Sequence, residues 1–118
     1  MAKVKYTLIV SARAQRDLRK LTRRNARLAK ALDACLGSLE SDPRPQGVEK
    51  LTGHAGTLKY DPRTGALLKQ AWQVDLWRVR VEGNCRLVYA ILDDLVLIIV
   101  TRVGDRKEVY ENIGDVDL

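Results

Sequence analysis

The sequence predicts an α+β domain in which an antiparallel sheet packs on an N-terminal α-hairpin. Three observations support this class. Residues 3–10 alternate between polar and apolar side chains, which is typical of a strand. Residues 12–40 repeat apolar side chains at intervals of three and four, which is typical of helices. After residue 46 the alternation with a period of two returns, so further strands follow the helices.

Composition is consistent with one compact domain over residues 1–118. Hydrophobic residues make up 46% of the 118 residues and charged residues 31%, which favours a packed core over a disordered chain. The longest apolar run, residues 95–100, is far shorter than the roughly 20 residues of a membrane span, and no signal-peptide pattern opens the chain. We therefore expect a cytoplasmic protein with no membrane partner.

The first helix is expected over residues 12–22, with Ser11 as its N-cap. Its apolar stripe consists of Ala14, Leu18 and Leu21. The opposite face is basic and carries Arg13, Arg16, Lys20 and Arg23, while Asp17 is the only acidic residue between positions 11 and 30. One face of this helix is thus predicted to pack and the other to present positive charge.

A second helix is expected over residues 24–40, where leucines and Cys35 recur at helical spacing. Pro43 and Pro45 end it. No glycine or proline lies between the two helices, so the pattern favours an antiparallel α-hairpin over a DNA-reading helix-turn-helix motif.

Three strands are expected over residues 77–81, 86–92 and 95–102, joined by turns at 82–84 and 93–94. The third is apolar on both faces and is predicted to be the buried strand of an antiparallel meander. Residues 57–60 and 66–69 flank a turn at 61–65 and predict an extra, inserted hairpin.

Arginines mark the candidate site. Arg78 and Arg80 share one face of the first strand of this meander, and Arg86 begins the next strand across a short turn. Guanidinium groups gathered in this way suit bidentate contacts to phosphate and can stabilise charge that develops in a transition state. The alternative is a solvated sheet face paired with carboxylates.

Metal chemistry is not expected. The chain has two cysteines, Cys35 and Cys85, and one histidine, His54, which cannot assemble an ordinary zinc site or a disulfide framework. Cys35 is predicted to be a core residue and His54 an exposed loop residue, and no cofactor is expected. The larger aromatic side chains are predicted to pack rather than to stack on bases: Tyr6, Trp72, Trp77 and Tyr89.

A family resemblance rests on the strands and on the end of the chain. Its most specific parts are Trp-Arg-Val-Arg-Val at 77–81, Cys-Arg-Leu-Val-Tyr at 85–89, Gly-Asp-Arg at 104–106 and Val-Tyr at 109–110. In this order and spacing they resemble the RelE/ParE toxin superfamily, and the resemblance covers most of the chain. It implies a single RelE-like β-α-α-β-β-β domain with an insertion over residues 54–71.

The resemblance also implies an activity and partners. RelE-like members are toxins of type II toxin-antitoxin modules that cut mRNA in the ribosomal A site, using the RNA's own 2′-hydroxyl and no metal ion. The implied partners are a cognate antitoxin, the ribosome and mRNA, with operator DNA reached only through the antitoxin complex. Two other functions stay open, a ParE-like inhibitor of DNA gyrase and a nucleic-acid-binding relative without catalysis.

Site residues follow from the resemblance position by position. The implied catalytic residues are Arg86, Arg106, Tyr110, Glu49 and Arg80. The implied RNA-binding residues are Arg78 together with Arg13, Arg16, Lys20 and Arg23 of the basic helix face, a face that could instead receive an acidic antitoxin segment.

The sequence departs from the family pattern in ways that leave the proton carrier open. Arginine stands where many relatives have lysine, and it cannot readily accept a proton, so Glu49 is the first candidate base and Tyr110 the second. Asp105 stands where many relatives carry histidine, and Cys85 replaces a common aromatic residue. The inserted segment is either a tolerated insertion or a basic arm that reaches ribosomal RNA through Lys59, Arg63 and Lys69.

Overall fold

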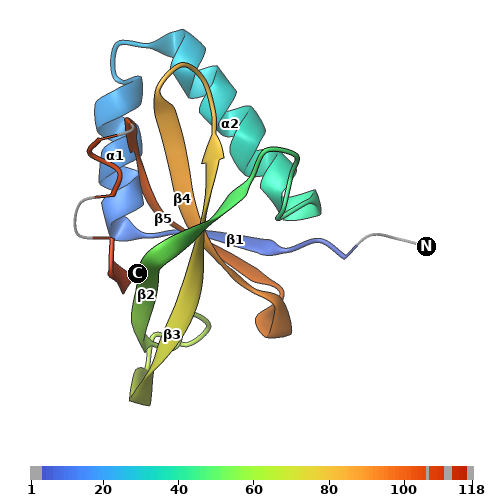
Figure 1. Ribbon diagram of the computed structural model, residues 1–118, viewed down its shortest axis with the longest axis vertical. Coiled ribbons are helices and arrows are strands. Elements are labelled where there is room, and N and C mark those ends of the chain that lie inside the picture. Colours follow the sequence, from blue (N-terminus) through green and yellow to red (C-terminus); the bar gives the residue numbers. More distant parts are fainter. Residues whose placement is uncertain (1–3, 106, 111–112, 117–118) are drawn as a thin grey trace.

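The computed structural model describes residues 4–105, 107–110 and 113–116. Two helices follow the first strand, and the remaining strands come after them (Figure 1). The elements, in chain order, are β1 (Thr7–Val10), α1 (Ala12–Thr22), α2 (Ala26–Ser41), β2 (Glu49–Tyr60), β3 (Leu67–Arg80), β4 (Cys85–Leu92), the 3₁₀ turn η1 (Asp93–Leu95), β5 (Leu97–Asp105) and β6 (Asp115–Val116). Neither α1 nor α2, the helices of the described residues, is long and apolar enough to cross a membrane.

The strands form one sheet in the order β1-β5-β4-β3-β2-β6. The four inner strands are antiparallel, whereas β1 runs parallel to β5 and β6 parallel to β2. The α+β class is confirmed, and the sheet is mixed at its edges rather than antiparallel throughout. The β1 pairing joins residues 7–10 to 97–100, and no local pattern reveals the direction of a partner so distant in the chain.

Both predicted helices are present and are capped by side chains. The Ser11 hydroxyl accepts a hydrogen bond from the backbone N–H of Ala14 at 3.1 Å, as expected of an N-cap. Asn25 caps α2 in the same way by accepting from the N–H of Leu28 at 3.0 Å. The second helix therefore begins at Ala26, two residues later than predicted, because Asn25 adopts a non-helical backbone to serve as the cap.

Apolar side chains cover both faces of the sheet. The face toward the helices packs Ala14, Leu32 and Leu39 against Leu87 and Val100. The other face forms a second core that includes Ile99 and, from the C-terminal segment, Val109 and Ile113. Strand β5 contributes to both cores, as its two apolar faces predicted. The predicted packing roles of Cys35 and of the four large aromatic residues are also confirmed.

The expected extra hairpin is the outer end of one long hairpin formed by β2 and β3. Tyr60 pairs with Leu67 at its tip, and the connecting loop lies at the end of the molecule away from the helices (Figure 1). The Asp61 carboxylate shapes this loop by accepting from the backbone N–H of Arg63 at 2.8 Å. That residues 54–71 are an insertion within the domain stays a prediction.

Near its start, β2 departs from regular pairing. Lys50 pairs with Trp77 and Ala55 with Asp75, so five residue steps on β2 face two on β3. Gly53 takes a φ of 78°, which glycine adopts without strain. We call residues 51–54 the β2 bulge. Bulges redirect side chains and are frequent beside active sites.

Candidate functional site

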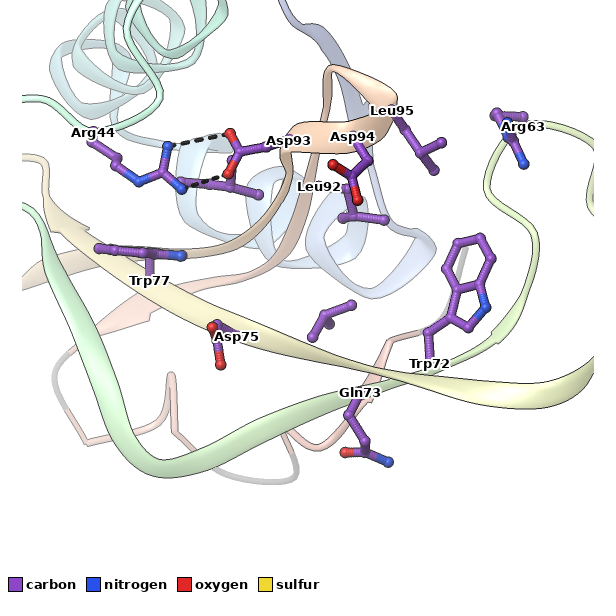
Figure 2. Close-up of a pocket in the computed structure, with 12 residues that line it drawn as sticks. Arg44, Arg63, Trp72, Gln73, Asp75, Trp77, Leu92, Asp93, Asp94 and Leu95 are labelled. Atoms are coloured by element: carbon purple, nitrogen blue, oxygen red, sulfur yellow. Dashed lines mark hydrogen bonds and ion pairs between the residues drawn. The ribbon is translucent and has the colours of Figure 1, made fainter.

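One cavity of about 580 Å³ lies beside β3 and η1 and is shown in Figure 2. We call it the tryptophan cavity, because Trp72 and Trp77 line it. The Arg44 guanidinium bonds Asp93 through both of its terminal nitrogens, at 2.8 and 3.3 Å, and lies 5.0 Å from the Trp77 ring centroid. Tyr6 donates a further hydrogen bond to Asp93 at 2.7 Å. This network ties the α2–β2 connection to β3, to η1 and to the residue that precedes β1, so its polar groups have structural partners.

A second cavity, of about 420 Å³, is rich in arginine. We call it the arginine cavity. Strands β2, β3 and β4 and the segment after β5 converge there, and its lining residues are Glu49, Lys50, Leu51, Thr52, His54, Arg78, Arg80, Arg86 and Tyr110. The structure thus brings together four of the five catalytic residues that the resemblance implies, along with Arg78. The fifth, Arg106, lies outside the described residues.

Strand register explains why the arginines converge. Arg80 pairs directly with Arg86 across β3 and β4, so their side chains leave the same face of the sheet. Arg78 lies two residues along β3 on that face, as the alternation predicted. The intervening Val79 and the preceding Trp77 instead pack in the core beneath the helices.

Arg86 has an unusual environment. It is only 3% exposed, and its Nη1 donates a long hydrogen bond of 3.4 Å to the Cys85 carbonyl oxygen. Its Nε is buried without a hydrogen-bond partner in the described structure. Burial of a charge costs several kcal/mol by order of magnitude unless it is paired. An anion bound in the arginine cavity would supply a partner for this guanidinium.

Glu49 and Arg78, which both line the arginine cavity, form an ion pair. The hydrogen bond from Arg78 to Glu49 is the main cause of a raised pKa for the Arg78 guanidinium, and Tyr110 adds to it. The Glu49 side chain is 61% exposed, so it remains accessible to a molecule in the cavity. A carboxylate and three guanidinium groups thus share one concave surface.

His54 belongs to this site, although the sequence predicted only an exposed loop residue. It is exposed, but it lies within β2, lines the arginine cavity and stacks on Tyr110 with ring centroids 6.3 Å apart and an interplanar angle of 18°. The β2 bulge places it there. The glycine at position 53 was the only signal in the sequence that the strand is interrupted at this point.

The basic face of α1 is separate from the arginine cavity. Helix α1 packs on the opposite face of the sheet from Arg78 and Arg86, so the structure does not bring its cations into the cavity. These cations are Arg13, Arg16, Lys20 and Arg23. The single acidic residue of this helix, Asp17, faces inward and accepts from Arg102 Nε at 2.9 Å and from the Val103 backbone N–H at 3.0 Å.

The remaining polar and sulfur groups have structural explanations. Burial raises the pKa of the Cys35 and Cys85 thiols, so neither is poised as a thiolate. The Asp105 carboxylate accepts from the backbone N–H groups of Glu108 and Lys107, which lower its pKa. Among the described residues, no three or more His, Cys, Asp or Glu side chains gather as a metal site would require.

Comparisons with known proteins agree with this architecture. The model of the ParE toxin of the type II toxin-antitoxin system parDE matches residues 8–110. The chain is 27% identical to a toxin-antitoxin complex structure from Mycobacterium tuberculosis, with a TM-score of 0.58 and coverage of 89% of this chain and 95% of that chain. No curated protein matches the chain.

Two further structures share the fold at lower identity. The archaeal RelE-RelB complex from Pyrococcus horikoshii is 20% identical, with a TM-score of 0.60 and coverage of 88% of this chain and 98% of that chain. The intact RelBE toxin-antitoxin complex of E. coli is 22% identical, with a TM-score of 0.58 and coverage of 86% and 98%. The chain therefore belongs to the ParE toxin family of type II toxin-antitoxin systems, within the RelE/ParE superfamily.

Proposed function

We propose that this toxin is an endoribonuclease that cuts mRNA on the ribosome, by attack of the RNA's own 2′-hydroxyl and without a metal ion. The observation that carries the proposal is Arg86, a guanidinium that borders the arginine cavity with its Nε buried and unpartnered among the described residues. A phosphodiester in the cavity would supply the missing anion. A toxin that acts by binding protein alone has no evident need for this arrangement.

The cleavage step needs charge stabilisation at phosphorus. The 2′-oxygen forms a bond to the adjacent phosphorus, and the bond from phosphorus to the 5′-oxygen breaks. Negative charge builds up on the phosphoryl oxygens meanwhile, and fixed guanidinium groups stabilise it. We assign this role to Arg86 and Arg80, with Arg78 holding the neighbouring RNA and Arg106 as a further contributor.

The 2′-hydroxyl must also lose a proton. The arginines cannot accept one, whereas the exposed carboxylate of Glu49 can. Its ion pair with Arg78 orients that carboxylate within the lining of the arginine cavity. We therefore assign Glu49 as the general base and keep the Tyr110 hydroxyl as the second candidate.

The proposed partners use other surfaces as well. The basic face of α1 is suited to ribosomal RNA, because cations that displace counterions from phosphates provide affinity without sequence specificity. A cognate antitoxin is proposed by analogy with the RelE-RelB complexes, and operator DNA is reached only through it. Replacement of Arg16 and Lys20 with Ala should weaken ribosome binding while purified toxin remains folded.

The test is primer extension on a cellular mRNA after brief induction of the wild type, of Arg86→Ala and of Arg86→Lys. We expect new in-frame mRNA ends with the wild type, none with Arg86→Ala and few with Arg86→Lys, because lysine keeps the charge but not the bidentate geometry. Circular dichroism of each purified variant shows whether it folds. Growth arrest by the wild type without new mRNA ends would refute the nuclease.

A second candidate function is inhibition of DNA gyrase, which the match to the ParE model favours. This function predicts growth arrest with intact mRNA. It also predicts that purified toxin blocks supercoiling by gyrase and that Arg86→Ala, if folded, blocks it equally well. Loss of mRNA cleavage and loss of gyrase inhibition are thus separable in the same set of variants. A third candidate, a non-catalytic nucleic-acid-binding relative, predicts neither effect.

A further inference from the structure

We propose that His54 is the acid that protonates the leaving 5′-oxygen in the proposed RNA cleavage. The inference rests on the proposed function and adds a residue to it. His54 is the only histidine of the chain, and it lines the same cavity as Arg78, Arg80 and Arg86. Asp105 does not line this cavity, and its carboxylate is engaged with the backbone N–H groups of Lys107 and Glu108.

The β2 bulge is the segment of the chain that carries His54 to the arginine cavity. A regular β2 would pair residues 51–54 with β3 and point them alternately to the two faces of the sheet. Five residue steps on β2 lie opposite two on β3. Residues of the bulge therefore line the arginine cavity instead. Leu51, Thr52 and His54 all line it, and the left-handed backbone at Gly53 allows the turn.

The imidazole of His54 stacks on a second residue that lines the arginine cavity. The ring of His54 lies nearly parallel to the ring of Tyr110, at an interplanar angle of 18° and a centroid distance of 6.3 Å. Tyr110 therefore serves as a positioning residue for His54. The charged groups that share the cavity with His54 are Glu49, Lys50, Arg78, Arg80 and Arg86. A bound phosphodiester would therefore lie beside the proposed base as well as beside the guanidinium groups that stabilise charge.

The chemistry needs a proton donor, and Lys50, the cavity's other cation that is not an arginine, is instead paired with Asp75 at 3.2 Å. When the 2′-oxygen attacks phosphorus, its proton passes to Glu49. As the bond from phosphorus to the 5′-oxygen breaks, the imidazolium of His54 gives its proton to that oxygen. The products are a 2′,3′-cyclic phosphate and a 5′-hydroxyl, and the later exchange of one proton with water restores both side chains. Guanidinium groups hold their protons too strongly for this step, and imidazole is the side chain best matched to it at neutral pH.

The test uses an mRNA whose cleavage site, mapped by primer extension, carries sulfur in place of the bridging 5′-oxygen. A thiolate leaves without protonation, so this substrate needs no acid. On programmed ribosomes we expect His54→Ala to slow cleavage of ordinary mRNA about a hundredfold and to slow cleavage of the sulfur substrate less than about threefold. Glu49→Gln is the matched control, because loss of the base should slow both substrates equally.

Each outcome decides the inference. If His54→Ala cleaves ordinary mRNA as fast as the wild type, or if the sulfur substrate does not relieve its defect, His54 is not the acid. If the wild type cleaves neither substrate, the proposed nuclease function itself fails, and the inference fails with it. Thermal unfolding of His54→Ala should match the wild type, since the side chain is exposed, so the loss of rate is not a loss of fold.

Discussion

The tryptophan cavity and the arginine cavity both contain arginine, but the guanidinium group is paired in the first and lacks a partner for its buried Nε in the second. Arg44 is held by both oxygens of Asp93 and by the Trp77 ring, as Figure 2 shows. Arg86 is more deeply buried, yet its Nε has no partner in the described structure. An arginine whose hydrogen bonds and charge are paired stabilises the packing of the elements that it joins. A buried arginine without such partners lowers the stability of the fold until a ligand pairs with it.

The largest expected effect comes from Arg86→Met, which removes the charge and keeps much of the volume. We expect mRNA cleavage to fall by about 10²–10³, because a donor to the developing charge is lost. We also expect the variant to be more stable than the wild type by about 1–3 kcal/mol, since replacing a buried charge with a packed apolar side chain is often stabilising. Single-turnover cleavage and urea unfolding measure the two effects.

The matched control is Arg44→Ala in the tryptophan cavity. It should lose about 1 kcal/mol of stability, because it breaks an ion pair and a cation–π contact that are partly exposed. Its cleavage rate should stay within about threefold of the wild type. If Arg86→Met is destabilised as Arg44→Ala is, the contrast between the two cavities is wrong.

A third arginine sharpens the comparison. Arg102 is nearly buried, and it bonds Asp17, whose side chain is only 18% exposed. We expect Asp17→Asn to lower the free energy of unfolding by about 3 kcal/mol, because it breaks a buried ion pair from one side. Asp33→Asn on the exposed part of α2 should change it by less than about 0.5 kcal/mol. Equal effects in the two variants would show that pairing does not determine the role of a buried arginine here.

The helices and the shared face of two cavity arginines could be predicted from the sequence, but the place of His54 and the pairing of Arg44 could not. The alternation in residues 77–81 placed Arg78 and Arg80 on one face, and the Ser11 cap and leucine spacing placed the helices. His54 was missed because a bulge breaks the period of two on which strand prediction depends. The partner of Arg44 was equally invisible in the sequence, since Asp93 lies 49 residues away in the chain.

Tyr110 tests the positioning part of the arginine cavity. If its ring orients His54 by stacking, Tyr110→Phe should cleave mRNA within about threefold of the wild type, and Tyr110→Ala should be slower by about tenfold to a hundredfold. If its hydroxyl is instead the general base, both variants should be slow. A sulfur-substituted leaving group should relieve Tyr110→Ala in the first case and neither variant in the second.

The smallest effect concerns pH and the tryptophan cavity. Hydrogen bonds from Arg44 and then from Tyr6 hold the pKa of Asp93 below its usual value of about 4. A carboxylate whose pKa is lowered by folding stabilises the protein above its unfolded pKa, and that contribution is lost as the pH falls through the lower, folded value. The coupling between Arg44→Ala and Asp93→Asn should therefore be about 0.5 kcal/mol at pH 7 and smaller at an acidic pH below the usual pKa of aspartate, where the carboxylate begins to take up a proton. Urea unfolding of the four proteins of the double-mutant cycle at the two pH values measures it. If the coupling is already absent at pH 7, Arg44 is held by the Trp77 ring rather than by the Asp93 charge, and the cation–π contact alone would account for its place in the tryptophan cavity.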